Sequence, residues 1–593
     1  MEHEDYGLLD RDSTDVWLTE AASEVLDYYH LYGRFLPRSE DLADCELDPI
    51  PADIVGGINV KQLFRDVAAE ARGSLTVKFL LEPLALLRGK RRAIVIPEGQ
   101  RSARPWIKPS VASTLAKIRG LPLFRVYTRP IFAHCSLFEV AKKERLTRLI
   151  SDARLGNHML QRLEGFRLFK LHQLHEAIRK WGCDDVVLLD FRHHFYQIPL
   201  PVGFARFFGV EDYTAEPPVQ LIPTAVPMGF HSAPCLGQSV TWAVVLARGT
   251  SSPPLGVDPS TYELPVMPEY VSLYEKDSQD TVEIGRVFVL LDGVAIFCSD
   301  EQLRHEWVNR LAENCRRYHA IIKSADGAPE GAPAIVSGRC EGGATFAGIN
   351  WSAQGVRPDK DLGESPALES LQDVAHVIGS LMWAIRARGH DLLDHEDILL
   401  LSQRIGQVAS ERNYNYRTPF ALSDEERDSL RRCWEAYRVM PRSQLPHRVP
   451  PGRKIWAVTD ATPKCRAFLV YNEDGTLRSI PSDASPISAE GPQGQQELDA
   501  VLDLAKYVSR SEGCACHIFL AIDNTAAQRV VEQGYSRVGG FRATLRELKR
   551  LGHYFTTVYV PSEENAADGP SRGAPVDDDR RNKTWARLLT VLQ

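Results

Sequence analysis

Four acidic residues in the C-terminal part of this 593-residue chain stand where they could jointly bind metal ions. Asp460, Asp523 and Asp568 each follow a short apolar stretch, and Glu497 falls in the first turn of an expected helix. Carboxylates that converge at the ends of buried strands repel one another unless they hold hard cations such as Mg²⁺. Two such ions about 3.5–4 Å apart can activate water and stabilise a leaving oxygen in phosphodiester cleavage. A single acid at a strand end is usually a turn residue, so this prediction depends on the whole set.

Two further acids, in the middle of the chain, could form a second metal site. Asp190 ends the apolar strand expected at 185–190, and Asp292 lies within the apolar stretch 287–297, which we interpret as another strand. Carboxylates on adjacent strands can hold a metal pair against a triphosphate and a primer hydroxyl, because nucleotidyl transfer depends mainly on positioning and charge neutralisation. Either acid alone is weak evidence, since an aspartate beside Gly293 can also be a turn residue.

The spacing of apolar residues predicts the elements that must position these acids. Short β-branched runs indicate buried strands at 185–189 and 286–291, and the stretch 301–320 has the pattern of an amphipathic helix. Residues 365–440 are expected to be helical. In the C-terminal part the expected order is strand 455–459, strand 467–471, helix 495–509, strand 517–522, helix 526–533, helix 540–551 and strand 554–560.

The C-terminal acids and their neighbours resemble the type I ribonuclease H of long-terminal-repeat and tyrosine-recombinase retroelements. The resemblance rests on Asp460 in Thr-Asp-Ala, Glu497 in Gln-Gln-Glu-Leu, Asp523 in Ile-Asp-Asn, and Asp568 in Asn-Ala-Ala-Asp-Gly-Pro-Ser-Arg. It covers about residues 454–572 and implies that these four acids are catalytic metal ligands. Cellular members of the family carry a histidine near the last aspartate, and this chain has none between His553 and Asp568.

Five ordered stretches between about 145 and 359 resemble reverse transcriptase motifs. They are 145–157 (fingers), 190–198 (motif A), 227–234 (motif B), 290–293 (motif C) and 344–359 (primer grip). The resemblance implies that Asp190 and Asp292 are catalytic metal ligands and that Arg148 contacts phosphate through its charged fork. It places Phe195 where an aromatic ring rejects the ribose 2′-hydroxyl. The nucleotide-binding residues that it implies are Arg148, Arg154, Phe195, Met228 and Gly229, with Gly229 allowing close backbone approach.

Some residues depart from the reverse transcriptase pattern or leave alternatives open. Gly293 stands where motif C has its second aspartate, which removes one carboxylate from the expected metal site. His194 stands where a small residue normally precedes the aromatic gate, and a metal site made of His193 and His194 is improbable because adjacent strand residues point to opposite faces. Lys323 either matches the motif D lysine that can protonate pyrophosphate or is a solvated surface residue.

The expected fold is a multidomain α/β and α+β protein. It combines a right-hand polymerase of fingers, palm and thumb, a helical connection, and a C-terminal ribonuclease H-like α/β domain. The expected parts are an N-terminal extension of unknown role (1–110), fingers and palm (111–360), thumb or connection helices with a linker (361–453), the ribonuclease H domain (454–575) and a C-terminal tail (576–593).

Composition is that of an ordinary globular protein, with 44% hydrophobic and 25% charged residues. The net charge of −8 argues against a uniformly basic surface but allows a local basic groove, and Arg88 to Arg92 form either part of one or a solvated loop. The eleven cysteines show no paired framework, Cys514 and Cys516 included, and predict reduced thiols. We expect no membrane span and no secretory signal, and therefore a cytoplasmic or nuclear protein rather than a secreted one.

The two resemblances together imply a retroelement reverse transcriptase–ribonuclease H, with motif spelling most similar to that of the DIRS and VIPER elements. The expected activities are RNA-templated DNA synthesis and cleavage of RNA in RNA–DNA hybrids, with Mg²⁺ or alternatively Mn²⁺ as cofactor. The expected partners are an RNA template, a DNA primer, the RNA–DNA hybrid and dNTPs. Two alternatives remain: a competent ribonuclease H with a weak or dead polymerase, and a domesticated nucleic-acid-binding scaffold.

Overall fold

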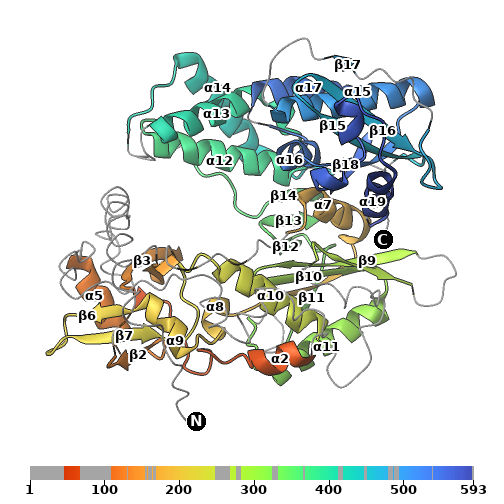
Figure 1. Ribbon diagram of the computed structural model, residues 1–593. Helices are drawn as coiled ribbons and strands as arrows, with labels where there is room; N and C mark the ends of the chain where they lie inside the picture. Colours follow the sequence, from red (N-terminus) through yellow and green to blue (C-terminus); the bar gives the residue numbers. More distant parts are fainter. Residues whose placement is uncertain are drawn as a thin grey trace, which may run out of the picture. The chain divides into compact units, whose positions relative to one another are not determined.

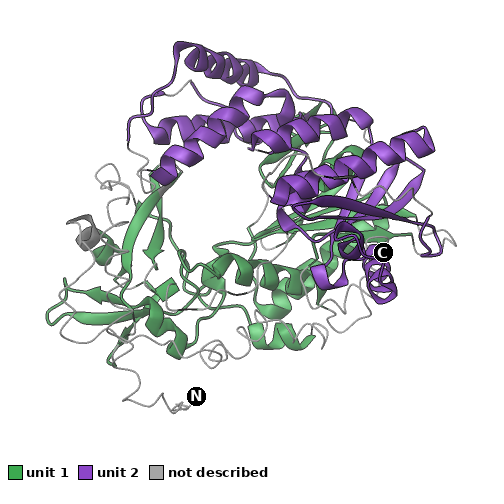
Figure 2. Ribbon diagram, turned by 45° about the horizontal axis from the view of Figure 1, so that its top comes forward, with its two compact units in different colours: residues 1–355 green, residues 356–593 purple. Residues whose placement is uncertain are grey.

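The computed structural model divides into two compact units, residues 1–355 and 356–593, which Figure 2 colours separately. It describes residues 46–66, 109–247, 268–364, 367–411, 418–446 and 451–590, apart from short gaps at 120, 130, 132, 144, 154–155, 158–159, 161–162, 164–167, 276–281, 324–331, 479–484, 487–492 and 537. Arg154 and the basic cluster Arg88 to Arg92 lie outside the described residues. None of the described helices is long and apolar enough to cross a membrane.

Unit 1 contains a five-stranded antiparallel sheet. Its strands, in spatial order, are β11 (Ala334–Ser337), β5 (Asp185–Asp190), β10 (Gly293–Cys298), β9 (Glu283–Leu290) and β8 (Val271–Tyr274). Figure 1 labels β9, β10 and β11 of this sheet. Successive strand residues point to opposite faces, so Val287 and Val289 join the main core with α10 (Ala233–Leu246) and α11 (Glu301–Tyr318). Phe288 points to the other face, where its ring meets Phe297. On that face Phe288 is fully buried and also meets the ring of Phe169, just before α7, so both faces of the sheet are covered.

Unit 1 also contains smaller sheets and short helices. One three-stranded sheet consists of β1 (Glu46–Leu47), β4 (Leu146–Asp152) and β3 (Ser136–Lys143), and another of β2 (Phe124–Tyr127), β7 (Val219–Pro223) and β6 (Val210–Asp212). The short helices and the helix before β5 are α2 (Val60–Asp66), α5 (Pro109–Ile118), α7 (Leu171–Trp181), α8 (His194–Gln197), α9 (Val202–Ala205) and the 3₁₀ turn Arg206–Phe208. Figure 1 shows β2, β3, β6, β7 and α5 gathered on one side of the unit, away from β9 and β10. Near the end of the unit, β12 (Ala344–Phe346) and β13 (Ile349–Ser352) form a hairpin, and β14 (Gly355–Pro358) follows at the unit boundary.

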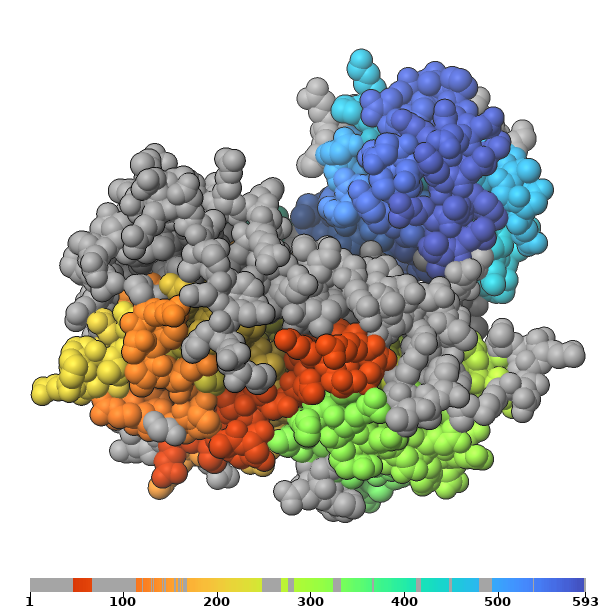
Figure 3. Space-filling view, turned by 60° about the horizontal axis from the view of Figure 1, so that its bottom comes forward, coloured from red at the N-terminus to blue at the C-terminus, as the bar shows by residue number. Residues whose placement is uncertain are grey.

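Residues 46–66, which the sequence left without a role, belong to the core of unit 1. β1 pairs in parallel with β4, and the buried side chains of α2 join the main hydrophobic cluster. Asp66 at the end of α2 accepts hydrogen bonds from Arg317 and Tyr318 of α11. Figure 3 shows this segment in red against the green residues of that helix.

Unit 2 contains a mixed five-stranded sheet and its covering helices. The spatial strand order is β17 (Ser485–Pro486), β16 (Cys465–Tyr471), β15 (Lys454–Ala461), β18 (His517–Ile522) and β19 (Tyr554–Tyr559), with β15, β18 and β19 parallel. The helices are α12 (Leu371–Ala387), α13 (Glu396–Glu411), α14 (Asp424–Val439), α15 (Gln493–Glu512), α16 (Thr525–Gln533), α17 (Gly539–Leu551), α18 (Asp568–Ser571) and α19 (Asp578–Leu589). Two 3₁₀ turns, Leu392–Asp394 and Ser562–Glu564, complete the unit.

The two faces of this sheet are buried by different segments. Ile455 and Ile518 share one cluster with α15, α17 and the helices α12 to α14. Trp456 and Phe519, which alternate with them, share another cluster with Leu588 of α19. The helices α12 to α14, which the sequence predicted as thumb or connection helices, therefore share a hydrophobic core with the C-terminal α/β part.

The mixed multidomain α/β and α+β class is confirmed, and the sequence predicted the elements of unit 2 more completely than those of unit 1. The C-terminal strands and helices occur in the expected order, and the region 365–440 forms three helices. The continuous strand expected through Asp292 is wrong, because β9 ends at Leu290 and β10 begins at Gly293. Leu291 adopts a left-handed φ of 54°, so the chain turns back there and Asp292 stands in a hairpin turn.

Candidate active sites

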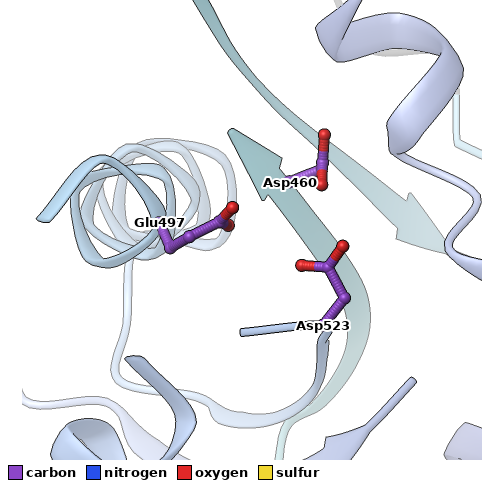
Figure 4. A group of neighbouring side chains, drawn as sticks. All are labelled: Asp460, Glu497 and Asp523. Carbon is purple, nitrogen blue, oxygen red and sulfur yellow. The ribbon is translucent and has the colours of Figure 1, made fainter. Parts of the chain in front are cut away.

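Three of the predicted acids of unit 2 converge at one end of the sheet. β15 and β18 run parallel with Thr459 opposite Ile522, which brings Asp460 near the end of β15 beside Asp523 just after β18. Glu497 comes from the first turns of α15, which packs against β15. Ligand atoms of the three side chains lie within 4.8 Å of one another, and Figure 4 shows the carboxylates pointing toward a common centre.

Burial makes this cluster electrostatically costly. Asp460 is 4% and Glu497 3% exposed. Burial, reinforced by the charge of Asp523, raises the pKa of Asp460 to about 6. Burial and the charges of Asp523 and Asp460 raise the pKa of Glu497 to about 8. Within the described part of the chain, Oε2 of Glu497 is buried without a hydrogen-bond partner. Such a set of oxygens fits a hard divalent cation, which would relieve the repulsion and satisfy the remaining lone pairs.

The segment after β19 fixes two of these acids by hydrogen bonds. Asn565 is fully buried, and its Nδ2 donates to the carbonyl of Thr459 at 3.1 Å and to Oδ1 of Asp460 at 3.5 Å. The hydroxyl of Ser571 donates to the other oxygen of Asp460. The hydroxyl of Ser562 donates to Asp523 at 2.9 Å. In the sequence, Asn565 and Ser571 were identified only as members of the motif around Asp568, and Ser562 was missed. Its position shortly before that motif is the feature that could have identified it.

Asp568, the fourth predicted ligand, has other partners. Arg572 Nε donates to its Oδ1 at 2.8 Å, and Arg580 Nη1 to its Oδ2 at 2.5 Å. Partial burial opposes ionisation, but these two guanidinium groups hold the pKa of Asp568 below its usual value. The three-acid group found among the described residues does not include it. Asp568 is close enough for its charge to contribute to the raised pKa of Asp460.

The structure also brings the two predicted acids of unit 1 together. Gly293 stands opposite Asp190 across the β10–β5 pair, so Asp292 in the preceding turn lies next to the end of β5. The backbone N–H of Phe191 donates to the carbonyl of Asp292 at 2.8 Å. Burial, reinforced by the charge of Asp190, raises the pKa of Asp292 to about 6. Lys323 forms an ion pair with Asp190, and its backbone N–H donates to the carbonyl of Asp190 at 2.7 Å.

Gly293 occupies a confined position. A Cβ atom there would lie 3.3 Å from Cε2 of Phe346 and on the same face as the side chain of Asp190, its cross-strand partner. An aspartate at 293 would therefore press on the Phe346 ring and place a like charge across from Asp190. The ring of Phe346 therefore lies where a larger side chain at position 293 would need space.

A cavity of about 470 Å³ in unit 1 is lined by four of the predicted residues: Arg148, Phe195, Met228 and Asp292. Leu47 and Asp48 from the N-terminal segment also line it, as do Lys142 and Lys323. Asp48, which sequence reasoning missed, forms an ion pair with Lys142 and lies 3.5 Å from Nδ1 of His193. The cavity therefore combines two acids, Asp48 and Asp292, with several cations and an apolar wall, and Asp190 is not among its lining residues.

The two histidines beside the cavity do not form a metal pair. His193 has a left-handed φ of 49° and faces Asp48. His194 is buried, its Nε2 lies 3.1 Å from the hydroxyl of Thr241, and burial lowers its pKa to about 3. The expected strand geometry is wrong here, since His194 begins the one-turn helix α8.

Gly229 lies outside the cavity lining but holds the neighbouring Met228 in place. Its φ is +125°, and a Cβ atom would lie 1.9 Å from the carbonyl oxygen of Ser151 in β4. The N–H of Ser151 donates to the carbonyl of Met228 at 2.7 Å, and Asn157 Nδ2 donates to the carbonyl of Gly229 at 2.8 Å. Only glycine allows this close contact between the two segments.

No family model and no curated protein sequence matches the chain. Among solved structures it is similar to a foamy viral protease-reverse transcriptase in complex with double-stranded DNA (14% identity, TM-score 0.38, covering 86% of this chain and 99% of that one). It is also similar to that type of protein in complex with an RNA/DNA hybrid (13%, 0.37, 91% and 60%) and to a form designated dRH with double-stranded DNA (12%, 0.38, 88% and 85%). At these TM-scores, a functional assignment has to rest on the site residues.

Proposed function

We propose that this chain is a retroelement reverse transcriptase with two active sites, in which unit 2 cleaves the RNA strand of RNA–DNA hybrids. The observation that carries the proposal is the convergence of Asp460, Glu497 and Asp523 within 4.8 Å at the ends of parallel strands. The five-stranded mixed sheet, with the strand order β17-β16-β15-β18-β19, supports a ribonuclease H-like reading of this unit. The DIRS- or VIPER-like subgroup remains a prediction from motif spelling.

In hydrolysis, some residues of unit 2 would bind metal ions and others would position these metal ligands. Asp460, Glu497 and Asp523 would hold Mg²⁺, or alternatively Mn²⁺. When bound, the ions supply an activated water and stabilise the leaving oxygen. Asn565, Ser571 and Ser562 keep two of the carboxylates in place, so that little reorganisation is needed when hybrid binds.

A second activity, nucleotidyl transfer, is supported by the cavity of unit 1. It combines Asp292, next to Asp190, with the cation Arg148 and the side chains of Phe195 and Met228. In this proposal Arg148 binds the triphosphate, Phe195 and Met228 contact the sugar and base, and the two aspartates position metal ions. Lys323 forms an ion pair with Asp190, and in this proposal it protonates the pyrophosphate that leaves.

Two isosteric substitutions in the full chain test the two activities separately. With Mg²⁺ we expect Asp523→Asn to abolish cleavage of a labelled RNA–DNA hybrid, and Asp190→Asn to abolish primer extension with dNTPs. Each variant should keep the other activity, because the two acids belong to different units. Glu473→Gln, at an exposed position of unit 2, is the control and should keep both.

The outcomes separate the alternatives. Cleavage without extension in the unaltered chain would support a ribonuclease H with a dead polymerase, as the loss of the second motif C acid at Gly293 allows. Neither activity with Mg²⁺ or Mn²⁺ from a folded protein would refute the proposal and leave a nucleic-acid-binding scaffold.

The role proposed for Phe195 has its own test. Its ring lies against the backbone of Gly237, where a Cβ atom would come within 2.9 Å of its Cε1. We expect Phe195→Ala to raise the kcat/KM for ribonucleotides relative to deoxyribonucleotides by about tenfold or more, since the steric barrier to a 2′-hydroxyl is removed. Phe195→Tyr keeps the ring and should keep the discrimination. An unchanged ratio in Phe195→Ala would show that the ring is not the sugar gate.

A further inference from the structure

The C-terminal helix α19 is firmly built into unit 2. The ring of Trp585 stacks on Tyr471, with centroids 5.4 Å apart, and Leu588 is fully buried in the cluster behind the sheet. The hydroxyl of Thr584 donates to the carbonyl of Glu564 at 2.7 Å and accepts from the N–H of Ala566 at 3.1 Å. The helix is therefore bonded to the segment that carries Asp568, although the sequence marked residues 576–593 only as a tail.

Arg580, in the first turns of this helix, reaches the carboxylate of Asp568. Its Nη1 donates to Oδ2 at 2.5 Å, and its side chain is 32% exposed. The backbone of the helix start is capped by Asp577, whose side chain accepts from the N–H of Arg580 at 2.9 Å. A guanidinium group on a capped helix that is anchored by the buried side chains of Thr584 and Leu588 is a fixed donor, so it fixes the orientation of the carboxylate that it binds.

The other oxygen of Asp568 is held in a different way. Oδ1 accepts from Nε of Arg572, whose side chain is 66% exposed. Asp568 raises the pKa of Arg572, with smaller contributions from the charges of Asp460 and Asp523. The hydroxyl of Ser571, in the same short segment, contacts both the carboxylate of Asp460 and, at 2.9 Å, the carbonyl of Asp568, so this segment lies beside the three-acid cluster.

We propose that Arg580 is a positioning residue, which holds Asp568 by Oδ2 so that Oδ1 is presented to a second divalent cation beside the three-acid cluster. The inference rests on the proposed ribonuclease H function and assigns α19 to the active site. An exposed arginine such as Arg572 can release Oδ1 at little cost, whereas α19 keeps its hold on Oδ2. Partners of this kind, bound to a ligand rather than to the ion, typically change metal affinity by about 10–100-fold.

Mn²⁺ binding to the full chain, measured by isothermal titration calorimetry, tests the assignment. We expect Arg580→Gln to weaken binding of the second ion of unit 2 about tenfold, with the first ion unchanged, and to raise the Mg²⁺ concentration for half-maximal cleavage. Arg580→Lys should restore part of the affinity. Arg587→Gln is the matched control, since Arg587 lies on the same helix and forms an ion pair with Glu564 of the same segment. It should leave both measurements unchanged.

Four results would overturn the inference. Equal effects of Arg580→Gln and Arg587→Gln would mean that α19 only stabilises the fold. Tighter Mn²⁺ binding by Arg580→Gln would mean that Arg580 competes with the ion rather than orienting its ligand. Absence of both cleavage and Mn²⁺ binding in the unaltered chain would overturn the proposed function together with this inference. Normal cleavage by the unaltered chain, with Mn²⁺ binding unchanged by Arg580→Gln, would overturn the inference alone.

Discussion

Replacing Glu497 by glutamine is expected to abolish hybrid cleavage and, at the same time, to stabilise the metal-free protein at pH 8. The side chain is buried between Asp460 and Asp523, and burial together with their charges raises its pKa from 4.5 to about 8. Glutamine fills nearly the same volume without the charge. The protein would thus lose a proposed metal ligand and gain stability through one substitution.

The direction of the pH dependence follows from this raised pKa. Below about pH 4.5 the carboxyl group is protonated in both the folded and the unfolded chain, and the folded state bears no cost. As the pH rises toward 8, the unfolded chain releases its proton while the folded chain retains it, so the free energy of unfolding falls. The total loss is roughly a few kcal/mol, because each unit of pKa shift corresponds to about 1.4 kcal/mol and the three acids titrate together.

Urea unfolding in EDTA at pH 5 and pH 8 measures this effect. The unaltered chain should lose stability between the two values, and Glu497→Gln should lose much less. Adding Mg²⁺ at pH 8 should stabilise the unaltered chain more than the variant, since the ion needs the carboxylate. Glu473→Gln, at an exposed position, should behave like the unaltered chain. Equal stability of the unaltered chain at pH 5 and pH 8 would contradict the electrostatic account of the cluster.

The sequence predicted a cluster of four acids, of which the structure groups three, but it did not predict the residues that hold them. Asp460 and Asp523 follow apolar strands, and parallel strands bring such positions to one edge, so their meeting could be expected from pattern alone. The partners of Asp568 could not, because Arg580 lies on a helix whose few apolar residues include Trp585 and Leu588 and whose docking depends on the far side of the sheet. Local pattern contains no information on that tertiary contact.

In unit 1, too, the sequence predicted the acids but not all of the structure around them. The meeting of Asp190 and Asp292 was predicted, but the strand expected through Asp292 is a hairpin turn, since apolar periodicity does not reveal the left-handed Leu291. Asp48 was missed because it stands in a segment without a motif, and only the parallel pairing of β1 with β4 brings it to the cavity. Sequence patterns identify the site residues within one element, but they do not show which residues of other elements will line the same cavity.

The contact between Gly229 and β4 supports a prediction about nucleotide binding. Alanine at 229 would adopt an unfavourable φ of +125° and put its Cβ atom 1.9 Å from the carbonyl of Ser151. The two segments must then separate, which breaks the bond between the N–H of Ser151 and the carbonyl of Met228. Because β4 carries Arg148 and both Arg148 and Met228 line the cavity, the cavity should lose its shape.

We therefore expect Gly229→Ala to lower the free energy of unfolding of unit 1 by at least about 2 kcal/mol and to abolish primer extension. Hybrid cleavage should continue, because the three-acid cluster belongs to unit 2. Gly342→Ala is the matched control in unit 1: its Cβ atom meets no described atom within 4 Å, so the change should stay within about 0.5 kcal/mol. Calorimetric melting and dNTP titration of both variants make the comparison. Normal melting and normal dNTP affinity in Gly229→Ala would show that the contact with β4 does not shape the cavity, and that Met228 and Arg148 act independently.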